Sequence, residues 1–389
     1  MSKKIKVIYI TFNGLTDPLG QSQVLPYLED LSKKGTKFYL ISLEKNLKEA
    51  KKISKNIADM GIEWYRLKYF RFNIVGMIFN NFQCSLLVLY LIIFKRAKII
   101  HARASQSMFA ALLAKKLFKV KTIFDMRGFW PDELADSGVI KKNSLYYKIL
   151  AFLDHKSISL SDYVIMLTPE AKEIIKNNYI GKKVTWMPTC VDENRFKDKE
   201  AISFNNRFTV VYLGSLWSYY DMPSMIDFFN VLKSKINNAH FLILGNNKTE
   251  KLYELFSQKG VDKKDYTIMT LSSQDVPKYL AGSDVAISFL YDSYSKKAAF
   301  PTKLAEYLIS GLPLVINAQS DYIRSLVNSN SIGVVLEELH KESYEAAAEK
   351  LLLLLKDRDI KSRCKDIART YLGKNICVNT YLDIYKELE

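Results

Sequence analysis

The sequence predicts an α/β protein of two doubly wound domains, each built on a parallel sheet covered by helices. Three observations support this class. Short apolar runs alternate with amphipathic stretches along the whole chain, as in consecutive β–α units. A polar, aperiodic segment at residues 188–207 interrupts the alternation, and a second series of strands follows it. The 389 residues and 48% apolar content suit two globular domains.

The first series of units occupies the first half of the chain. Val24, Tyr27, Leu28 and Leu31 have the i, i+3, i+4, i+7 spacing of one helical face. Helices are also expected at residues 105–118 and 143–160. Strands are expected at residues 6–12, 38–43, 97–102, 121–126, 163–167 and 184–187.

The second series begins after the polar segment, and its chain end is expected to be helical from residue 342 to 389. The predicted domains are residues 1–195, with a final helix at about 373–389 packing back on them, and residues 196–372. Strands of the second domain are expected at residues 208–214, 241–244, 266–269, 285–289, 314–317 and 333–336.

Positive charge is concentrated in the first half. The chain carries +16, and residues 1–195, with 32 basic and 17 acidic side chains, hold +15 of it. No RRM, KH or helix-turn-helix pattern accompanies this charge, so nucleic acid is not an expected partner. Residues 86–94 are uninterrupted apolar residues followed by basic ones. They are too short to span a bilayer, which needs about 20 residues, so they are either a core helix or part of a patch on an anionic membrane.

Several common sites are not indicated. The sequence has no GxGxxG, GxxxxGK[ST], GxSxG or HExxH, its four histidines are scattered, and its cysteines form no CxxC. An Asp357-Arg-Asp359 triplet is expected on a solvated helix face. We therefore predict neither a metal site nor a bound cofactor.

The start of one expected helix carries the strongest functional signal. Pro301 suits the first helical position, and Thr302 and Lys303 follow it in the first turn. Free N–H groups at a helix start, together with the Lys303 charge, favour an anion. Glu306 lies one turn further on, where a carboxylate can accept the two hydroxyls of a ribose. The competing interpretation is an ordinary capped helix with an exposed Lys–Glu pair.

This segment resembles the donor-site helix of GT-B glycosyltransferases of family 4, whose pattern is E-x7-E followed by a G-x-P-V turn. Glu306 matches the second glutamate and the turn at residues 311–315 matches G-x-P-V, but Ala298 stands in the place of the first glutamate. The local P-T-K-x-x-E-Y form resembles a variant branch. The resemblance implies the GT-B fold, two Rossmann-like domains facing each other across a cleft, with the acceptor on the first domain and the nucleotide-sugar on the second.

Two segments of the first domain resemble the family's acceptor side. Gly20, Gln21 and Ser22 stand in a loop like the family's first strand-to-helix loop, although a plain turn and helix cap would use the same residues. Asp125, Arg127 and Glu133 belong to a segment like the family's strand-end motif, and Arg127 stands where many members have a cleft histidine. An arginine there indicates a substrate contact or a structural salt bridge. Its partner among Asp125, Asp132 and Glu133 stays open.

Two loops of the second domain resemble its donor side. Gly214 and Ser215 follow the opening strand, in a loop that in the family faces the donor diphosphate, and Thr270 and Leu271 would border the base. Most relatives have an arginine and a lysine in the first loop. Here its side chains are aromatic instead: Trp217, Tyr219 and Tyr220.

The resemblance implies a retaining, metal-independent transferase that moves a sugar from a nucleotide-sugar to a lipid-linked or oligosaccharide acceptor. The expected setting is bacterial surface polysaccharide assembly, such as O-antigen or capsule, with the protein in the cytoplasm on the inner face of the membrane. Alternatives are a nucleotide-sugar epimerase or hydrolase of the same fold, and a catalytically degenerate, membrane-docked binding subunit.

Overall fold

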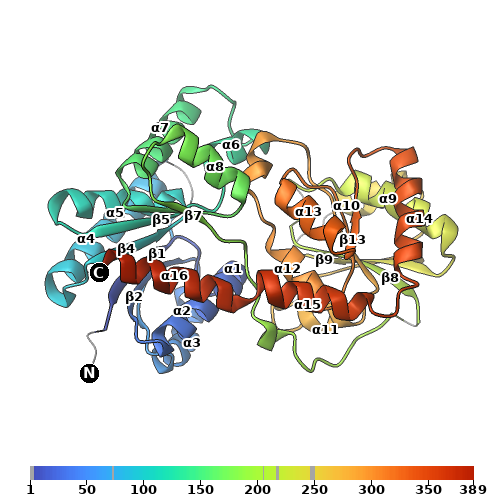
Figure 1. Cartoon of the computed structure of the whole chain (residues 1–389), viewed down its shortest axis with the longest axis horizontal. Helices are drawn as coiled ribbons and strands as arrows, with labels where there is room; N and C mark the ends of the chain where they lie inside the picture. Colours follow the sequence, from blue (N-terminus) through green and yellow to red (C-terminus); the bar gives the residue numbers. More distant parts are fainter. Residues whose placement is uncertain (1–3, 72–73, 205, 216–218, 246–249) are drawn as a thin grey trace. The chain divides into compact units, whose positions relative to one another are not determined.

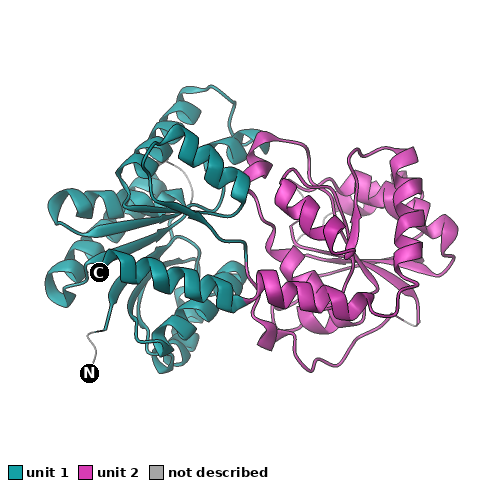
Figure 2. Cartoon of the chain, in the orientation of Figure 1, with its two compact units in different colours: residues 1–189, 374–389 teal, residues 190–373 magenta. Residues whose placement is uncertain are grey.

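The computed structural model describes residues 4–71, 74–204, 206–215, 219–245 and 250–389 (Figure 1). The chain forms two compact units (Figure 2). Unit 1 is Met1–Thr189 with Lys374–Glu389, and unit 2 is Cys190–Gly373. The sequence-based division after residue 195 differs from this one because the short helix η1 (Glu193–Arg195) belongs to unit 2.

Unit 1 contains a seven-stranded parallel sheet of order β3-β2-β1-β4-β5-β6-β7 in its described residues. Both faces of the inner strands are buried, which accounts for their continuous Val/Ile/Phe runs. The strands are β1 (Lys6–Thr11), β2 (Lys37–Glu44), β3 (Glu63–Lys68), β4 (Ile99–Arg103), β5 (Lys121–Asp125), β6 (Tyr163–Met166) and β7 (Val184–Trp186).

The helices of unit 1 begin with ordinary capping chemistry. Asn46 accepts hydrogen bonds from Lys48 N and Glu49 N, and Ser144 and Thr168 cap two other helices in the same way. The helices are α1 (Pro18–Gln23), α2 (Leu25–Lys33), α3 (Leu47–Asp59), α4 (Ile74–Lys95), α5 (Ser105–Leu117), α6 (Trp130–Asp136), α7 (Leu145–Leu160), α8 (Pro169–Asn178) and α16 (Lys374–Leu388).

Unit 2 contains a six-stranded parallel sheet of order β10-β9-β8-β11-β12-β13 in its described residues. Its strands are β8 (Phe208–Leu213), β9 (Ala239–Leu244), β10 (Tyr266–Met269), β11 (Val285–Ser288), β12 (Leu314–Ile316) and β13 (Gly333–Val335). Its helices are η1, α9 (Met222–Lys235), α10 (Glu250–Gln258), η2 (Lys263–Asp265), α11 (Val276–Ala281), η3 (Tyr294–Ala298), α12 (Thr302–Ile309), α13 (Asp321–Ser329), α14 (Lys341–Leu354) and α15 (Ile360–Leu372).

Both sheets reverse their strand order once, between β1 and β4 in unit 1 and between β8 and β11 in unit 2. Ligands of doubly wound folds bind beyond the carboxyl ends of the strands at this reversal. A ligand is therefore expected at the loops that follow β1, β4 and β5 in unit 1, and β8 and β11 in unit 2.

Two features differ from the sequence-based expectation. Strand β3 was not predicted, because it is an edge strand whose polar residues remain partly exposed and interrupt the apolar pattern. The chain end is helical, as expected, but the Asp357-Arg-Asp359 triplet lies in the turn between α14 and α15 rather than on a helix face. There Asp357 accepts a hydrogen bond from Asp359 N at 2.9 Å and pairs with Arg363 at 2.7 Å.

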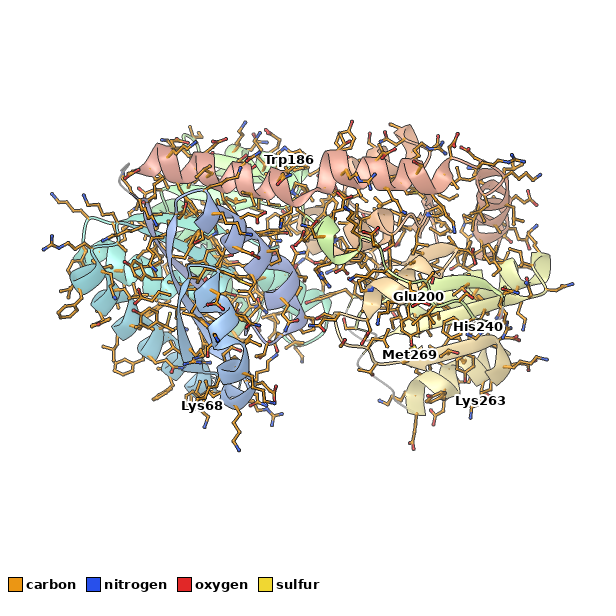
Figure 3. The ribbon with its side chains drawn as sticks, turned by 90° about the horizontal axis from the view of Figure 1, so that it is seen from below. Lys68, Trp186, Glu200, His240, Lys263 and Met269 are labelled. Atoms are coloured by element: carbon orange, nitrogen blue, oxygen red, sulfur yellow. The ribbon has the colours of Figure 1, made fainter. Side chains whose placement is uncertain are left out.

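Side chains follow the usual division between interior and surface. Lys68, at the end of β3, and Lys263, in η2, point outward, whereas His240 in β9 is buried and stacks on Phe204 (Figure 3). Burial lowers the pKa of His240 to about 4. His240 is therefore neutral at physiological pH and belongs to the packing of unit 2.

Helix α16 completes the core of unit 1 through two buried tyrosines. The Tyr381 hydroxyl donates a hydrogen bond to Asp125 Oδ2 at 2.9 Å, and the Tyr385 hydroxyl lies 2.7 Å from His101 Nδ1. All four side chains are buried. The C-terminal helix is thus held to the ends of β4 and β5 by hydrogen bonds inside the core.

We expect Tyr381→Phe to destabilise unit 1 by about 1–3 kcal/mol, because it leaves a buried carboxylate oxygen without its donor. Urea denaturation followed by circular dichroism measures this change. Tyr371→Phe on α15, where the tyrosine is exposed, is the matched control. Equal stabilities of the two variants would contradict the assigned hydrogen bond.

Candidate functional site

The centre of unit 2's candidate site is Lys303, in the first turn of α12. Its side chain is 6% exposed, and its Nζ has no hydrogen-bond partner among the described residues. Nζ lies 3.4 Å from the ring centroid of Tyr220 and 4.1 Å from that of Tyr212. The ammonium group is therefore surrounded by aromatic faces, which attract a cation but do not accept its hydrogen bonds as an oxygen would.

Gly214, directly after β8, holds the loop against this lysine. Its φ is +131°, and a Cβ at this position would lie 2.8 Å from Lys303 Nζ. The Tyr212 hydroxyl donates a hydrogen bond to the carbonyl of Ser215, the residue after Gly214. The positive φ favours glycine here, and a side chain at this position would have to displace the Lys303 ammonium group. The structure thus brings together three residues that the sequence placed on the donor side: Gly214, Ser215 and Lys303.

Burial lowers the pKa of Lys303 well below its ordinary value, and Glu306 opposes this only in part. An anion delivered to Nζ would reverse the effect by supplying the missing acceptor and charge. The adjoining start of α12 has no side-chain cap: Pro301 is the N-cap residue and Thr302 the first helical one, one position later than predicted. A helix N-terminus beside an unpartnered lysine suits a phosphate.

Glu306 is also buried, at 8% exposure, which excludes the exposed Lys–Glu pair considered from the sequence. Burial raises its pKa, although Arg195 donates to Glu306 Oε1 at 3.3 Å. Arg195 also donates to the Ser273 carbonyl at 3.0 Å. The arginine therefore links α12 to the loop after β10, where Thr270 and Leu271 lie.

Sequence reasoning missed Arg195 because it stands in the polar segment interpreted as a linker. It also missed Lys296 in η3, which is buried with its Nζ 3.6 Å from the ring centroid of Tyr219. The sequence did contain a signal for this arrangement. Tyr219 and Tyr220 stand where most relatives have cations. Lys296, shortly before α12, and Lys303, in its first turn, can stack on tyrosine rings. Trp217 lies outside the described residues.

In unit 1, Asp125 and Arg127 lie together beyond β5. Arg127 Nη1 is 3.2 Å from Asp125 Oδ1, and Nη2 donates to Thr189 Oγ1 at 3.4 Å. Asp125 is the partner left open by the sequence. Burial by itself would raise the pKa of this carboxyl, but Arg127 and His101 hold it below its usual range. Because Asp125 is fully buried, its contacts support positioning of Arg127.

Glu133 lies close by in the chain, with its carboxylate over Gly128. A Cβ on Gly128 would be 2.2 Å from Glu133 Oε1. Sequence reasoning missed Arg103, at the end of β4, which is buried and whose Nε has no hydrogen-bond partner among the described residues. Two arginines thus lie near the carboxyl ends of β4 and β5.

Gly20, Gln21 and Ser22 form part of α1 rather than an open loop. A Cβ on Gly20 would lie 2.2 Å from the Gly14 carbonyl oxygen, so the close backbone approach at this glycine is to the chain itself. Ser22 Oγ donates to the Pro18 carbonyl at 2.8 Å. The preceding loop is held by the buried Glu44, which accepts from Leu15 N at 2.6 Å. The acceptor-binding role of the three residues stays a prediction.

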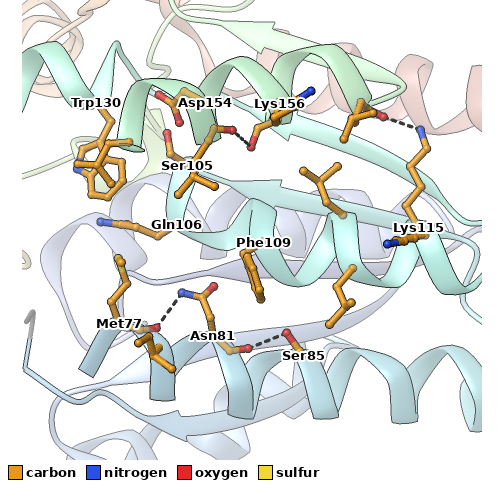
Figure 4. Close-up of a pocket in the computed structure, with 18 of the residues that line it drawn as sticks. Met77, Asn81, Ser85, Ser105, Gln106, Phe109, Lys115, Trp130, Asp154 and Lys156 are labelled. Carbon is orange, nitrogen blue, oxygen red and sulfur yellow. Dashed lines mark hydrogen bonds between the residues drawn. The ribbon is translucent and has the colours of Figure 1, made fainter. Parts of the chain in front are cut away.

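Unit 1 contains a groove of about 970 Å³ between α4, α5 and α7. We call it the α4–α5–α7 groove (Figure 4). Trp130, Ser105 and Gln106 lie at one end and Lys115 at the other. Apolar side chains dominate its lining: Met77, Ile78, Phe82, Phe109, Leu112, Leu113, Leu150, Leu153 and Leu160.

Asp154 is the one carboxyl that lines this groove in the described residues. The Asp154 side chain is buried, and its Oδ2 has no hydrogen-bond partner among the described residues. Burial raises the pKa of Asp154 to about 7. Lys115, Lys116 and Lys156 also line the groove, so its charged lining is predominantly positive.

We expect Asp154→Asn to become progressively more stable than the natural protein as pH rises from about 4 to about 7. The folded state holds the Asp154 proton up to about pH 7, but the unfolded state loses it near pH 4, so the aspartate contribution to stability decreases across this window. The difference corresponds to at most about 4 kcal/mol. Urea denaturation at pH 5 and pH 8 checks this, and a pH-independent difference would contradict it.

Known proteins resemble this chain in part of its sequence and in its fold. Residues 193–371 match the family model of glycosyl transferases group 1. No curated protein matches the chain in sequence. Among solved structures, the sucrose-phosphate synthase of Thermosynechococcus elongatus has a TM-score of 0.77 at 11% identity, with 99% of each chain covered.

Two further structures are similar over the whole length. Anabaena HepE, solved with UDP and glucose, has a TM-score of 0.70 at 12% identity over 99% of this chain and 100% of that one. WaaG, a glycosyltransferase involved in lipopolysaccharide biosynthesis, has a TM-score of 0.65 at 14% identity over 96% and 99%. At such identities the likeness shows the fold alone. The family match spans nearly all of unit 2, and the chain as a whole has the GT-B fold.

Proposed function

We propose that the protein is a retaining, metal-independent glycosyltransferase that moves a sugar from a nucleotide-sugar to a lipid-linked acceptor. The setting we propose is bacterial surface polysaccharide assembly at the inner face of the cytoplasmic membrane. One observation carries the donor assignment: the buried Lys303 ammonium group, without an oxygen partner in the described structure, beside the start of α12. The family match of unit 2 and the UDP complex of HepE support it.

We assign the parts of the donor to residues of unit 2. Lys303 and the N–H groups at the start of α12 would hold the diphosphate, with Gly214 and Ser215 against it. Glu306 would accept the ribose hydroxyls, positioned by Arg195. The loop at Thr270 and Leu271 would border the base.

The reaction breaks the bond between the sugar and the diphosphate and forms a bond to an acceptor hydroxyl, whose proton is released. Negative charge grows on the departing diphosphate. A positioned cation and helix N-terminus in a water-poor site stabilise such charge without reorganising. We assign Lys303 and α12 this task in unit 2, and assign acceptor contacts in unit 1 to Arg127, held by Asp125, with Glu133 nearby.

Glu306→Ala is expected to lower transfer at least 100-fold with the fold intact, because ribose contacts position the donor. Nucleotide release from a panel of nucleotide-sugars, with and without membrane extract, measures this. Glu345→Ala on α14, an exposed glutamate, is the matched control. Natural activity in Glu306→Ala would overturn the ribose assignment.

The same assay separates the alternative functions. Release that depends on the extract supports transfer. Turnover without extract would instead indicate an epimerase or hydrolase, and donor binding without turnover would indicate a binding subunit.

We expect UDP binding to take up a proton. Burial depresses the pKa of Lys303 in the empty protein, and a diphosphate raises it again, so affinity should fall as pH rises. The neighbouring titratable groups are Glu306, Tyr212, Tyr220 and Tyr307. Calorimetry in two buffers of different ionisation enthalpy detects the proton. Lys303→Met should abolish the uptake, and its persistence would assign the proton to another group.

A further inference from the structure

Helix α4 has two apolar faces, and only one of them is covered. Its inner face is buried against the sheet and α5, and there Asn80 exchanges two 3.0 Å hydrogen bonds with the backbone of Phe70. The segment Val75–Lys95 is long and apolar enough to cross a membrane, with a mean hydropathy of 1.8. Because the inner face is packed and its polar group is satisfied within unit 1, α4 lies along the domain instead of leaving it.

The opposite face of α4 is an exposed apolar stripe. Its members recur every three or four residues, which is the spacing of one helical face. They are Val75, Ile78, Phe79, Phe82, Leu86, Tyr90, Ile93 and Phe94. Soluble proteins rarely expose a continuous apolar surface of this extent unless it binds something.

Helix α7 carries a second exposed stripe on the other side of the groove. Its members again follow helical spacing: Leu145, Ile149, Phe152, Leu153 and Leu160. The α4–α5–α7 groove lies between the two stripes, with Phe109 and Leu113 of α5 in its lining (Figure 4). Its volume of about 970 Å³ is at the upper end of the range for small-molecule sites.

Charge on these three helices has one sign. They carry five lysines, Lys95, Lys115, Lys116, Lys148 and Lys156, and a single carboxyl, the buried Asp154. Long lysine side chains can lie along apolar surface while their charge reaches a polar layer. Each lysine near an anionic bilayer contributes about 1 kcal/mol to binding. Two of these lysines are ion-paired, Lys95 with Glu63 at 2.8 Å and Lys115 with Asp162 at 2.6 Å, so Lys116, Lys148 and Lys156 carry the net charge of the three helices. Apolar stripes flanked by net positive charge are complementary to an anionic lipid surface.

We propose that the α4–α5–α7 groove binds one long aliphatic chain of an anionic membrane lipid, drawn from a bilayer on which the stripes of α4 and α7 rest. The groove fits a chain better than a compact ligand because it is elongated along α5, from Ser105 to Lys116. Exposed stripes continue its apolar lining onto the surface, so a chain can enter from the bilayer without crossing water.

One end of the groove lies near the candidate acceptor site. Ser105 follows Arg103 by two residues at the end of β4, and Trp130 follows Arg127 by three at the end of β5. The Trp130 end of the groove therefore lies at the sheet edge that carries both arginines. On the proposed transferase function, the bound lipid would be the acceptor, with its anionic head at this edge. That last step rests on the proposed function, whereas the lipid site does not.

Trp130 provides a direct readout, since bromine on a lipid chain quenches tryptophan fluorescence only at close range. We expect vesicles of phosphatidylglycerol with brominated acyl chains to quench the protein, and Trp130→Phe to remove most of that quenching. Trp64 and Trp186 do not line the groove, and Trp217 lies outside the described residues. Saturating vesicle binding without quenching of Trp130 would overturn the groove assignment.

Leu153→Glu tests the groove from its wall, and Leu353→Glu is its matched control in unit 2. The two leucines are 41% and 65% exposed, on α7 and α14. We expect Leu153→Glu to weaken binding to phosphatidylglycerol vesicles at least tenfold and Leu353→Glu to bind like the natural protein. Equal binding of the two variants, or equal binding of the natural protein to phosphatidylcholine vesicles, would overturn the proposal.

Three measurements distinguish loss of lipid binding from misfolding and from dimerisation. Circular dichroism and UDP binding establish that Leu153→Glu is folded. Sedimentation velocity tests whether the groove instead joins two copies of the chain: a dimer in the natural protein that Leu153→Glu dissociates would overturn the lipid assignment. If the groove fails these tests while Glu306→Ala still abolishes turnover, the transferase proposal stands without it.

Discussion

Parallel pairing is the constraint on which both units depend. Because every strand in each sheet runs the same way, all carboxyl ends meet at one edge, and the single reversal of strand order opens a place there for a ligand. Gly214 follows β8 at that edge of unit 2, and Arg103 and Asp125 end β4 and β5 at that edge of unit 1. Residues far apart in sequence, such as Gly214 and Lys303, come within contact distance for this reason. The helices between strands have another task, which is to cover the sheet.

Two lysine side chains of unit 2 lie in an unusual environment. Lys303 and Lys296 are both buried with their ammonium groups over tyrosine rings. Aromatic faces stabilise a cation less than an oxygen ligand would, so burial still depresses the pKa of Lys303. An anion at Lys303 would supply the charge and the hydrogen-bond acceptor that its surroundings lack. The tyrosines that replace the expected arginine and lysine after β8 are thus part of the same site, through the lysines they hold.

Most of the fold followed from local pattern. Twelve strands could be located from apolar runs because a parallel sheet buries both faces of its inner strands, and β3 was missed because an edge strand keeps polar, partly exposed residues. Only part of the candidate site could be predicted from the sequence. Lys303 and Glu306 were predicted from a helix start and a one-turn spacing, and Gly214 from the family resemblance of its loop. Arg195, Lys296 and Arg103 stand in segments with no pattern of their own, and their positions depend on contacts with distant chain segments.

The sequence by itself determined that this is an α/β chain of two domains and that its positive charge belongs to the first half, and it predicted a nucleotide-type anion at the helix that carries Lys303. Only the tertiary structure decided that Asp125 pairs with Arg127, that Lys303 and Glu306 are buried rather than exposed, and that α4 is covered on one face and open on the other. The physical reason is that periodicity and charge are properties of neighbouring residues, whereas burial is a property of what packs against them. A helix apolar all round has the same sequence pattern whether both of its faces are covered or one remains free to bind.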